Sequence, residues 1–332
     1  MAHGGGGSRM LELLEEVVFP ALGGGTPLEA EDAAALSLPE MEAGGKIAYT
    51  TDSFVVKPMI FPGGDIGKLA VCGTVNDLSM RGARPLYLTV GLILEEGLPL
   101  ETLREALASL GRWAAEAGVA VVAGDTKVVE RGAADGMYIN TSGIGVIPAG
   151  REVSISGARP GDVLLLSGCV GDHETAVLSR REGLDFRVEV ESDCAPLNGL
   201  VEAMLEAGGV HAMRDPTRGG LAASLKEMAT ASGVALEVSE GDVPVRDGVR
   251  AFCELLGLDP FLLANEGKLL AAVAEEAAPA VLAAMRAHPL GAEAAAVGRV
   301  AEGRAGEVSL LTPLGSHRLL RMPSGEHFPR IC

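Results

Sequence analysis

The chain has 332 residues, with 27 Lys and Arg against 45 Asp and Glu, and a formal net charge of −18. This acidic excess disfavours nucleic-acid backbones and anionic membrane surfaces, and no apolar run reaches the roughly 18 residues that a membrane-spanning helix needs. We therefore expect no nucleic-acid partner and no membrane association, and the length predicts two domains.

The first half alternates strand and helix patterns. A helix is expected from about Arg9, and its apolar face includes Leu13 and Val17. Strands are then predicted at 46–51, 86–94, 119–123 and 138–147, and helices at 67–80 and 98–118. This spacing is typical of βαβ units and predicts an α/β domain over residues 1–150.

A turn cluster at 157–162 marks the start of the second half, so a second α/β domain is predicted over 151–315. Strands are expected at 163–167, 236–238 and 269–273, and helices at 197–208, 219–232, 249–256 and 277–287. Residues 316–332 contain two prolines and a glycine near their end, which predicts an extended, mobile tail.

The five cysteines are widely spaced and form no CxxC motif, which indicates a reducing, cytoplasmic location. Cys332 is the last residue of the predicted tail. An exposed thiol with no packing role is suited to chemistry, so we expect Cys332 to react. The other four lie in apolar or capped contexts and are expected in the core: Cys72, Cys169, Cys194 and Cys253.

Four carboxylates lie at or near the ends of apolar segments: Asp32, Asp52, Asp77 and Asp125. Ligands of α/β proteins bind at the carboxyl ends of strands, so these acids could converge on one site. Converging carboxylates repel one another unless a hard cation such as Mg²⁺ neutralises them. The alternative is that each aspartate caps a helix or a turn.

Glycine-rich and basic segments could bind phosphate. Residues 4–7 and 63–67 could present backbone amides to a triphosphate, and Lys127 could hold a phosphate or polarise a carbonyl. The simpler interpretations are that residues 4–7 form a leader, that residues 63–67 form a surface loop, and that Lys127 is a solvated ammonium group.

Two turns of the second half carry further polar groups. Residues 214–221 place two arginines, a carboxylate and a double glycine before a helix, an arrangement suited to an anion. Glu266 follows Asn265 in a turn and is a candidate general base. A capped helix start and an ordinary turn glutamate remain open as alternatives.

Taken together, these segments resemble the HypE family of hydrogenase maturation proteins, within the superfamily of aminoimidazole ribonucleotide synthetase and selenophosphate synthetase. The resemblance covers essentially the whole chain. It is carried by residues 2–7, 31–34, 51–56, 73–80, 124–132, 192–198, 214–221, 265–267 and 329–332. The terminal Pro-Arg-Ile-Cys together with Gly-Asp-Thr-Lys-Val-Val-Glu-Arg-Gly at 124–132 is its most specific part.

The resemblance implies an α/β (α+β) fold with two PurM-like domains, the first forming a β-barrel across a homodimer and the second ferredoxin-like. It also implies an ATP-dependent carbamoyl dehydratase, a carbon–oxygen lyase that converts an S-carbamoyl group on its own Cys332 to a thiocyanate. The cyano group then serves the iron of [NiFe] hydrogenases. The implied partners are a carbamoyltransferase of the HypF type and an iron scaffold of the HypC–HypD type.

The implied site residues fall into three groups, with ATP and Mg²⁺ as the implied cofactors. The catalytic residues would be Cys332, Glu266 and Lys127. The ATP-binding residues would be Gly5, Gly6, Asp52, Asn76, Asp77, Asp125 and Thr126, and the metal ligands Asp32, Asp52, Asp77 and Asp125.

Two other hypotheses fit the same residues less completely. One is a related ATPase or kinase that acts on a free small molecule, such as a purine precursor or thiamine phosphate. The other is a non-catalytic thiol carrier that docks maturation partners. The first would not need Cys332, and the second would not bind Mg·ATP.

Overall fold

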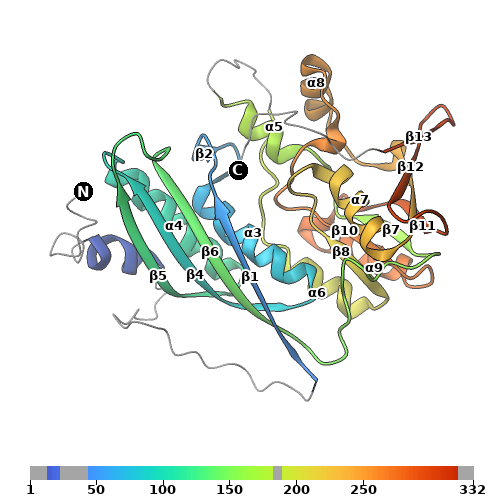
Figure 1. Ribbon diagram of the computed structural model, residues 1–332, viewed down its shortest axis with the longest axis horizontal. Helices are drawn as coiled ribbons and strands as arrows, with labels where there is room; N and C mark the ends of the chain where they lie inside the picture. Colours follow the sequence, from blue (N-terminus) through green and yellow to red (C-terminus); the bar gives the residue numbers. More distant parts are fainter. Residues whose placement is uncertain (1–12, 23–43, 182–188, 321–332) are drawn as a thin grey trace.

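The computed structural model describes residues 13–22, 44–181 and 189–320. Its first half is a four-stranded sheet of order β1-β6-β4-β5, covered on one face by α3 and α4 (Figure 1). The elements are β1 (Lys46–Phe54), α3 (Ile66–Met80), β4 (Arg84–Glu95), α4 (Leu100–Glu116), β5 (Ala120–Val129) and β6 (Met137–Ile147). Before them come η2 (Leu14–Val18) and α2 (Phe19–Leu22), and β2 (Ile60–Phe61) pairs with β3 (Gly64–Asp65).

Helix α3 is the centre of the first half. Asp65 caps it, because its Oδ1 accepts hydrogen bonds from the N–H groups of Gly67 and Lys68 at 2.8 and 2.9 Å. Nearly every residue of α3 is buried, since it packs on β1 and β6 on one side and on α4 and α6 on others. A helix that is apolar almost all round belongs in such an interior position.

The second half is a seven-stranded sheet of order β13-β12-β9-β11-β7-β10-β8. Its strands are β7 (Val163–Leu166), β8 (Val210–Arg214), β9 (Ala235–Ser239), β10 (Leu270–Val273), β11 (Ala295–Ala301), β12 (Glu307–Leu311) and β13 (His317–Leu319). Its helices are α5 (Asp172–Leu178), α6 (Asn198–Ala207), α7 (Gly220–Ser232), α8 (Asp247–Leu256) and α9 (Ala278–Ala287), with short 3-10 turns η3 (Glu240–Asp242), η4 (Pro260–Leu262) and η5 (Pro289–Gly291).

Helices cover both faces of this second sheet. Strand β7 shows why: Leu164 and Leu166 pack in the core that contains α7, while Leu165 packs in the core that contains α6 and α9. Side chains alternate between the two faces of a strand, so an unbroken apolar run is what a strand buried on both faces requires.

The predicted fold class is confirmed: two mixed α/β halves. The βαβ reading is correct for β4-α4-β5, where the two strands pair in parallel. It is wrong for β1, β6 and β4, which pair antiparallel, and most pairs of the second sheet are antiparallel too. The division into residues 1–150, 151–315 and 316–332 stays a prediction.

Strands β1 and β5 continue beyond their predicted ends, and this changes the position of three site residues. Strand β1 continues to Phe54, and β5 continues to Val129. Asp52, Asp125 and Lys127 therefore lie within strands and not just beyond their ends. Because side chains alternate between the two faces of a strand, the face on which each of these three residues lies determines which groups it can contact.

None of the helices in the described ranges is long and apolar enough to cross a membrane.

Candidate active site

Asp52 and Asp77 lie together between β1 and α3. Thr50 and Asp52 share the face of β1 that packs on α3, and the Thr50 hydroxyl donates to Oδ2 of Asp77 at 2.9 Å. Gly73 permits the close approach, since a Cβ built there would be 2.8 Å from the Phe54 ring and 3.6 Å from Oδ2 of Asp52. Asp77 follows one helical turn later. The structure thus brings together two of the four predicted metal ligands.

A third carboxylate, Asp215, belongs to the same group, which we call the acidic cluster (Asp52, Asp77 and Asp215). Burial raises the pKa of Asp215 to about 6, and the charges of Asp77 and Asp52 also raise it. Burial likewise raises the pKa of Asp52 and of Asp77, although Arg218 lowers both. A cation would relieve this repulsion, and carboxylate oxygens are the ligands that Mg²⁺ prefers.

Among the described residues, the acidic cluster does not form a complete metal site by itself. Within the residues that the structure covers, no three His, Cys, Asp or Glu side chains are placed to hold a metal ion together. A small cavity of about 240 Å³ opens beside the cluster and is lined by Thr50, Asp77 and Arg214, among others. Hard oxygen donors, a cavity and arginines suit a magnesium-bound phosphate chain, with further ligands supplied from elsewhere.

Asp125 and Lys127 lie on the opposite face of the first sheet. Asp52 pairs across the sheet with Thr141, whose hydroxyl contacts Thr74 of α3. Asp125 is in register with Gly91, and Gly91 with Asn140, one position along the strands from the Asp52–Thr141 pair. Because side chains alternate between the two faces of a sheet, Asp125 faces away from α3. We call this face, away from α3 and α4, the open face.

On the open face Asp125 and Lys127 form an exposed ion pair. Lys127 Nζ lies 2.7 Å from both carboxylate oxygens, and this hydrogen bond holds the pKa of Asp125 below its usual value. Asp125 therefore lies apart from Asp52 and Asp77 within one chain.

Two predicted nucleotide contacts, Thr126 and Asn76, are buried in this structure. Thr126 is 4% exposed and lies on the helix-covered face of β5, in register with Leu92. Asn76 is 2% exposed: its Nδ2 donates to the carbonyls of Ala195 and Glu266 at 3.1 Å each, and its Oδ1 accepts from Leu197 N at 2.8 Å. With its amide engaged by the backbone, Asn76 joins the two halves of the chain.

Glu266 lies in the turn before β10 and is buried. Burial raises its pKa well above the usual range, and the neighbouring Cys194 and Asp215 raise it further. A raised pKa makes the carboxylate of Glu266 a stronger base, which is the property expected of a general base. Asp215 and Asp52 act on it, so the acidic cluster lies within electrostatic reach.

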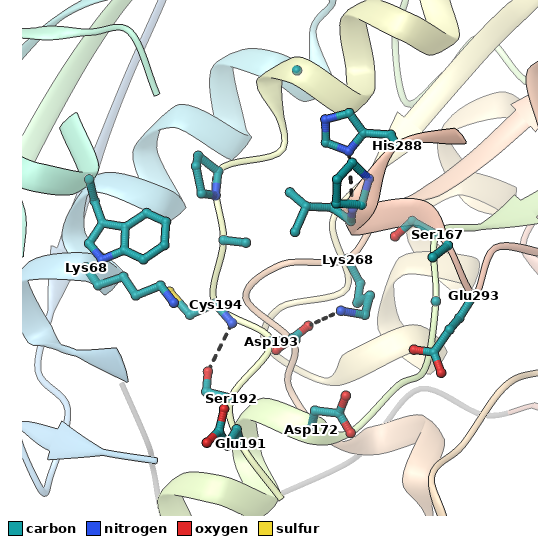
Figure 2. Close-up of a pocket in the computed structure, with 18 of the residues that line it drawn as sticks. Lys68, Ser167, Asp172, Glu191, Ser192, Asp193, Cys194, Lys268, His288 and Glu293 are labelled. Atoms are coloured by element: carbon teal, nitrogen blue, oxygen red, sulfur yellow. Dashed lines mark hydrogen bonds and ion pairs between the residues drawn. The ribbon is translucent and has the colours of Figure 1, made fainter. Parts of the chain in front are cut away.

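A larger cavity of about 860 Å³ lies on the other side of this turn, between α4 and the second half. Figure 2 shows the segment that carries Ser192 and Cys194 running through its middle, with Lys68 on one side and Lys268 on the other. The Asp193–Lys268 ion pair closes its floor at 3.3 Å. None of the predicted site residues that the structure describes lines this cavity.

Four predicted residues lie outside the described residues: Gly5, Gly6, Asp32 and Cys332. Sequence reasoning did not single out Asp215 by itself, although it selected the 214–221 turn that contains it. It also missed Asp193, whose importance depends on contacts with residues more than 70 positions away.

Comparisons with known proteins cover the whole chain. Residues 30–147 match the family model described as the N-terminal domain of AIR synthase related protein, and residues 159–310 match its C-terminal domain. The chain is 49% identical to carbamoyl dehydratase HypE of Rhizobium leguminosarum bv. viciae, over 100% of the chain and 94% of that protein. It is 48% identical to carbamoyl dehydratase HypE of Escherichia coli (strain K12), over 100% and 98%.

Solved structures give the same result. The chain is similar to hydrogenase maturation protein HypE in complex with ATP, with a TM-score of 0.94 and 49% identity over 100% of this chain and 99% of that one. It is also similar to a chain of a HypE–HypF complex, with a TM-score of 0.81 and 45% identity over 96% and 100%. A thiamine-monophosphate kinase of Stenotrophomonas maltophilia K279a, at 23% identity and a TM-score of 0.65, shares the fold.

Proposed function

The chain belongs to the HypE family of carbamoyl dehydratases, and we propose that it uses ATP to convert an S-carbamoyl group on Cys332 to a thiocyanate for [NiFe] hydrogenase maturation. Full-length identity of 48–50% to HypE proteins carries this conclusion. The buried Glu266 within electrostatic reach of the acidic cluster agrees with it.

The chemistry requires a better leaving group than an amide oxygen. The carbamoyl oxygen attacks the γ-phosphorus of ATP, the bond from that phosphorus to the bridging oxygen breaks, and ADP leaves. Loss of the N–H protons then forms the C≡N bond while the C–O bond breaks and phosphate departs. Glu266 accepts one N–H proton and the departing phosphate carries the other, while positive charge nearby stabilises the transferring phosphoryl group.

The nucleotide is held through the acidic cluster. Asp52 and Asp77, with Asp32, would hold Mg²⁺, which would neutralise the charge of the phosphates. Arg214 and Arg218 lie near the same carboxylates and would contact phosphate oxygens. Gly5 and Gly6 would add backbone amides.

Asp125 and Lys127 are proposed to act in a homodimer. Their place on the open face separates them from the acidic cluster of their own chain. The same face exposes apolar side chains: Ile47 is 51% exposed, Tyr49 68% and Ile93 41%. A second copy would cover this apolar surface, complete a β-barrel, and bring Asp125 and Lys127 to a site shared between copies.

The proposed partners follow from the chemistry of Cys332. A carbamoyltransferase of the HypF type would load the thiol, and the solved HypE–HypF complex of a relative supports this. An iron scaffold of the HypC–HypD type would accept the cyano group. The described cysteines Cys72, Cys169, Cys194 and Cys253 are buried free thiols, in keeping with a reducing cytoplasm.

Intact-mass analysis tests the function. The full chain is carbamoylated by its donor system and incubated with Mg·ATP; the adduct on Cys332 is expected to lose the mass of one water molecule. Cys332→Ser should carry no adduct. An adduct that keeps its full mass while ATP is bound would refute the dehydratase, and activity on a free small molecule without Cys332 would favour the kinase alternative.

A further inference from the structure

One buried carboxylate, that of Asp193, accepts hydrogen bonds from the backbone of the turn that carries Glu266. Asp193 is 1% exposed in its side chain and lies in the segment between α5 and α6. Its Oδ1 accepts from Glu266 N at 3.1 Å and its Oδ2 from Gly267 N at 3.2 Å. Both backbone donors of the turn thus point at a single side chain that comes from another part of the chain.

Lys268 completes this arrangement. Its Nζ lies 3.3 Å from Oδ2 of Asp193 and also donates to the carbonyl of Gly267 at 3.3 Å. A buried carboxylate with no counter-charge would be costly, and the ion pair with Lys268 offsets the cost of burying Asp193. Charge-assisted bonds from two N–H groups are stronger than neutral ones, which favours a fixed turn.

The turn fits against Asp193 with no spare room. A Cβ at Gly267 would lie 1.8 Å from the Asp193 carbonyl oxygen, so any larger residue there would push the turn away. On the other side Asn76 donates to the Glu266 carbonyl. The backbone of Glu266 is therefore held at its N–H by Asp193 and at its C=O by Asn76, which fixes the point from which its side chain extends.

We propose that Asp193 is the positioning residue of the general base: its carboxylate fixes the Glu266–Gly267 turn so that Glu266 meets the N–H group of the carbamoyl substrate. This inference rests on the proposed function. A base must lie within hydrogen-bond distance of the proton that it removes, and a displacement of about 1 Å can cost about 100-fold in rate.

The charges around Glu266 make the role measurable through pH. Besides Asp193, the groups that act on Glu266 are Cys194 of the same segment, Asp215 after β8 and Asp52 of β1, and all of them raise its pKa. Replacing Asp193 by asparagine removes a negative charge and releases Lys268, and both changes lower the pKa of Glu266. The acid limb of the rate profile should then move to lower pH.

The test compares Asp193→Asn with Lys268→Met in the full, carbamoylated chain, measuring single-turnover dehydration against pH and Mg·ATP affinity by calorimetry. We expect Asp193→Asn to lower the rate about 10- to 100-fold, with ATP affinity unchanged and the acid limb at lower pH. Lys268→Met keeps both N–H contacts to Asp193, so its dehydration rate should fall less. Loss of the Lys268 ammonium cannot lower the pKa of Glu266, so the acid limb of the rate profile should not move to lower pH.

Gly267→Ala is a second, independent variant, because it displaces the turn without changing any charge. It should lose rate as Asp193→Asn does but keep the wild-type acid limb. A wild-type rate in folded, ATP-binding Asp193→Asn, together with loss in Glu266→Gln, would overturn the positioning role. If the wild-type protein itself left the carbamoyl group unchanged, the proposed function would fail instead.

Discussion

The side-chain amide of Asn76 donates to the carbonyl oxygen of Glu266 at 3.1 Å, across 190 positions of the sequence. The next residue of α3, Asp77, belongs to the acidic cluster and is bonded to Thr50 of β1. One helix therefore contacts both the acidic cluster of the first half and the turn of the second half that carries Glu266. The spacing between the acidic cluster and this turn is set by α3.

Glu266→Gln should abolish dehydration while the protein still binds Mg·ATP. Glutamine keeps the size and the backbone contacts of the turn but cannot accept a proton, so we expect a rate loss of at least about 100-fold. Single-turnover intact-mass kinetics measure it. In the wild-type protein the rate should rise with pH through a pKa well above the usual glutamate range, because burial favours the protonated form. A rate that is independent of pH would contradict this assignment.

Asp77→Asn should weaken Mg·ATP binding. The variant keeps the shape of the side chain but removes one charge from the acidic cluster, and we expect at least a tenfold loss, about 1.4 kcal/mol. Isothermal titration with Mg·ATP measures it. Asp135→Asn is the matched control, since Asp135 is exposed and pairs with Lys57 at 2.9 Å, away from the cluster. Equal affinities of the two variants for Mg·ATP would show that Asp77 is not a metal ligand.

Tyr49→Asp should convert the proposed homodimer to a monomer. Tyr49 is 68% exposed on the open face, and a carboxylate there would be buried without a partner if a second copy covered it. Sedimentation velocity at several protein concentrations gives the mass. Leu314→Asp is the control, because Leu314 is 96% exposed in the β12–β13 turn of the other half. If both variants keep the wild-type mass, the open face is not the dimer interface.

Glu174→Gln should stabilise the protein at alkaline pH. Burial raises the pKa of Glu174 to about 7, and its Oε2 accepts from Ala264 N at 2.7 Å, a bond that glutamine can keep. Between the ordinary value and about 7 the folded chain holds a proton that the unfolded chain lacks, so the free energy of unfolding falls as pH rises. At about pH 8 the variant should gain up to about 3 kcal/mol, and at about pH 4 nearly nothing.

Denaturant unfolding of both proteins at the two pH values measures that difference. Burial lowers the pKa of His173 to about 4, but His173 titrates in both proteins and cancels in the comparison. An equal change in stability at the two pH values would mean that Glu174 is not protonated in the folded protein.

Much of the fold could be predicted from local patterns. The helices at 67–80 and 219–232 match α3 and α7 within a residue, because caps and apolar spacing are properties of the segment itself. Strand pairing could not be predicted in this way: β1 and β6 are antiparallel partners more than 80 residues apart. The register between β1 and β6 depends on packing against α3, so it cannot be deduced from the sequence of either strand alone.

The candidate site could be predicted only in part, because residue type and position are local properties whereas the packing between distant segments is not. Asp52, Asp77 and Glu266 were selected by residue type and position, and the structure places them within electrostatic reach of one another. The face of Asp125 could not be deduced, since it depends on how far β5 continues. The structural role of Asn76 was also hidden, because an amide that supports a distant turn looks the same in sequence as one that contacts a ligand.

Strand β1 limits how this family of sequences can change length. Thr50 and Asp52 point to α3, whereas Tyr49 and Thr51 point to the open face, so one strand serves two surfaces in alternation. Inserting or deleting a single residue before Thr50 would exchange the two sets and place Tyr49 against Asp77. Viable length variants inside β1 should therefore differ by an even number of residues, whereas the turns that flank it are free of this constraint.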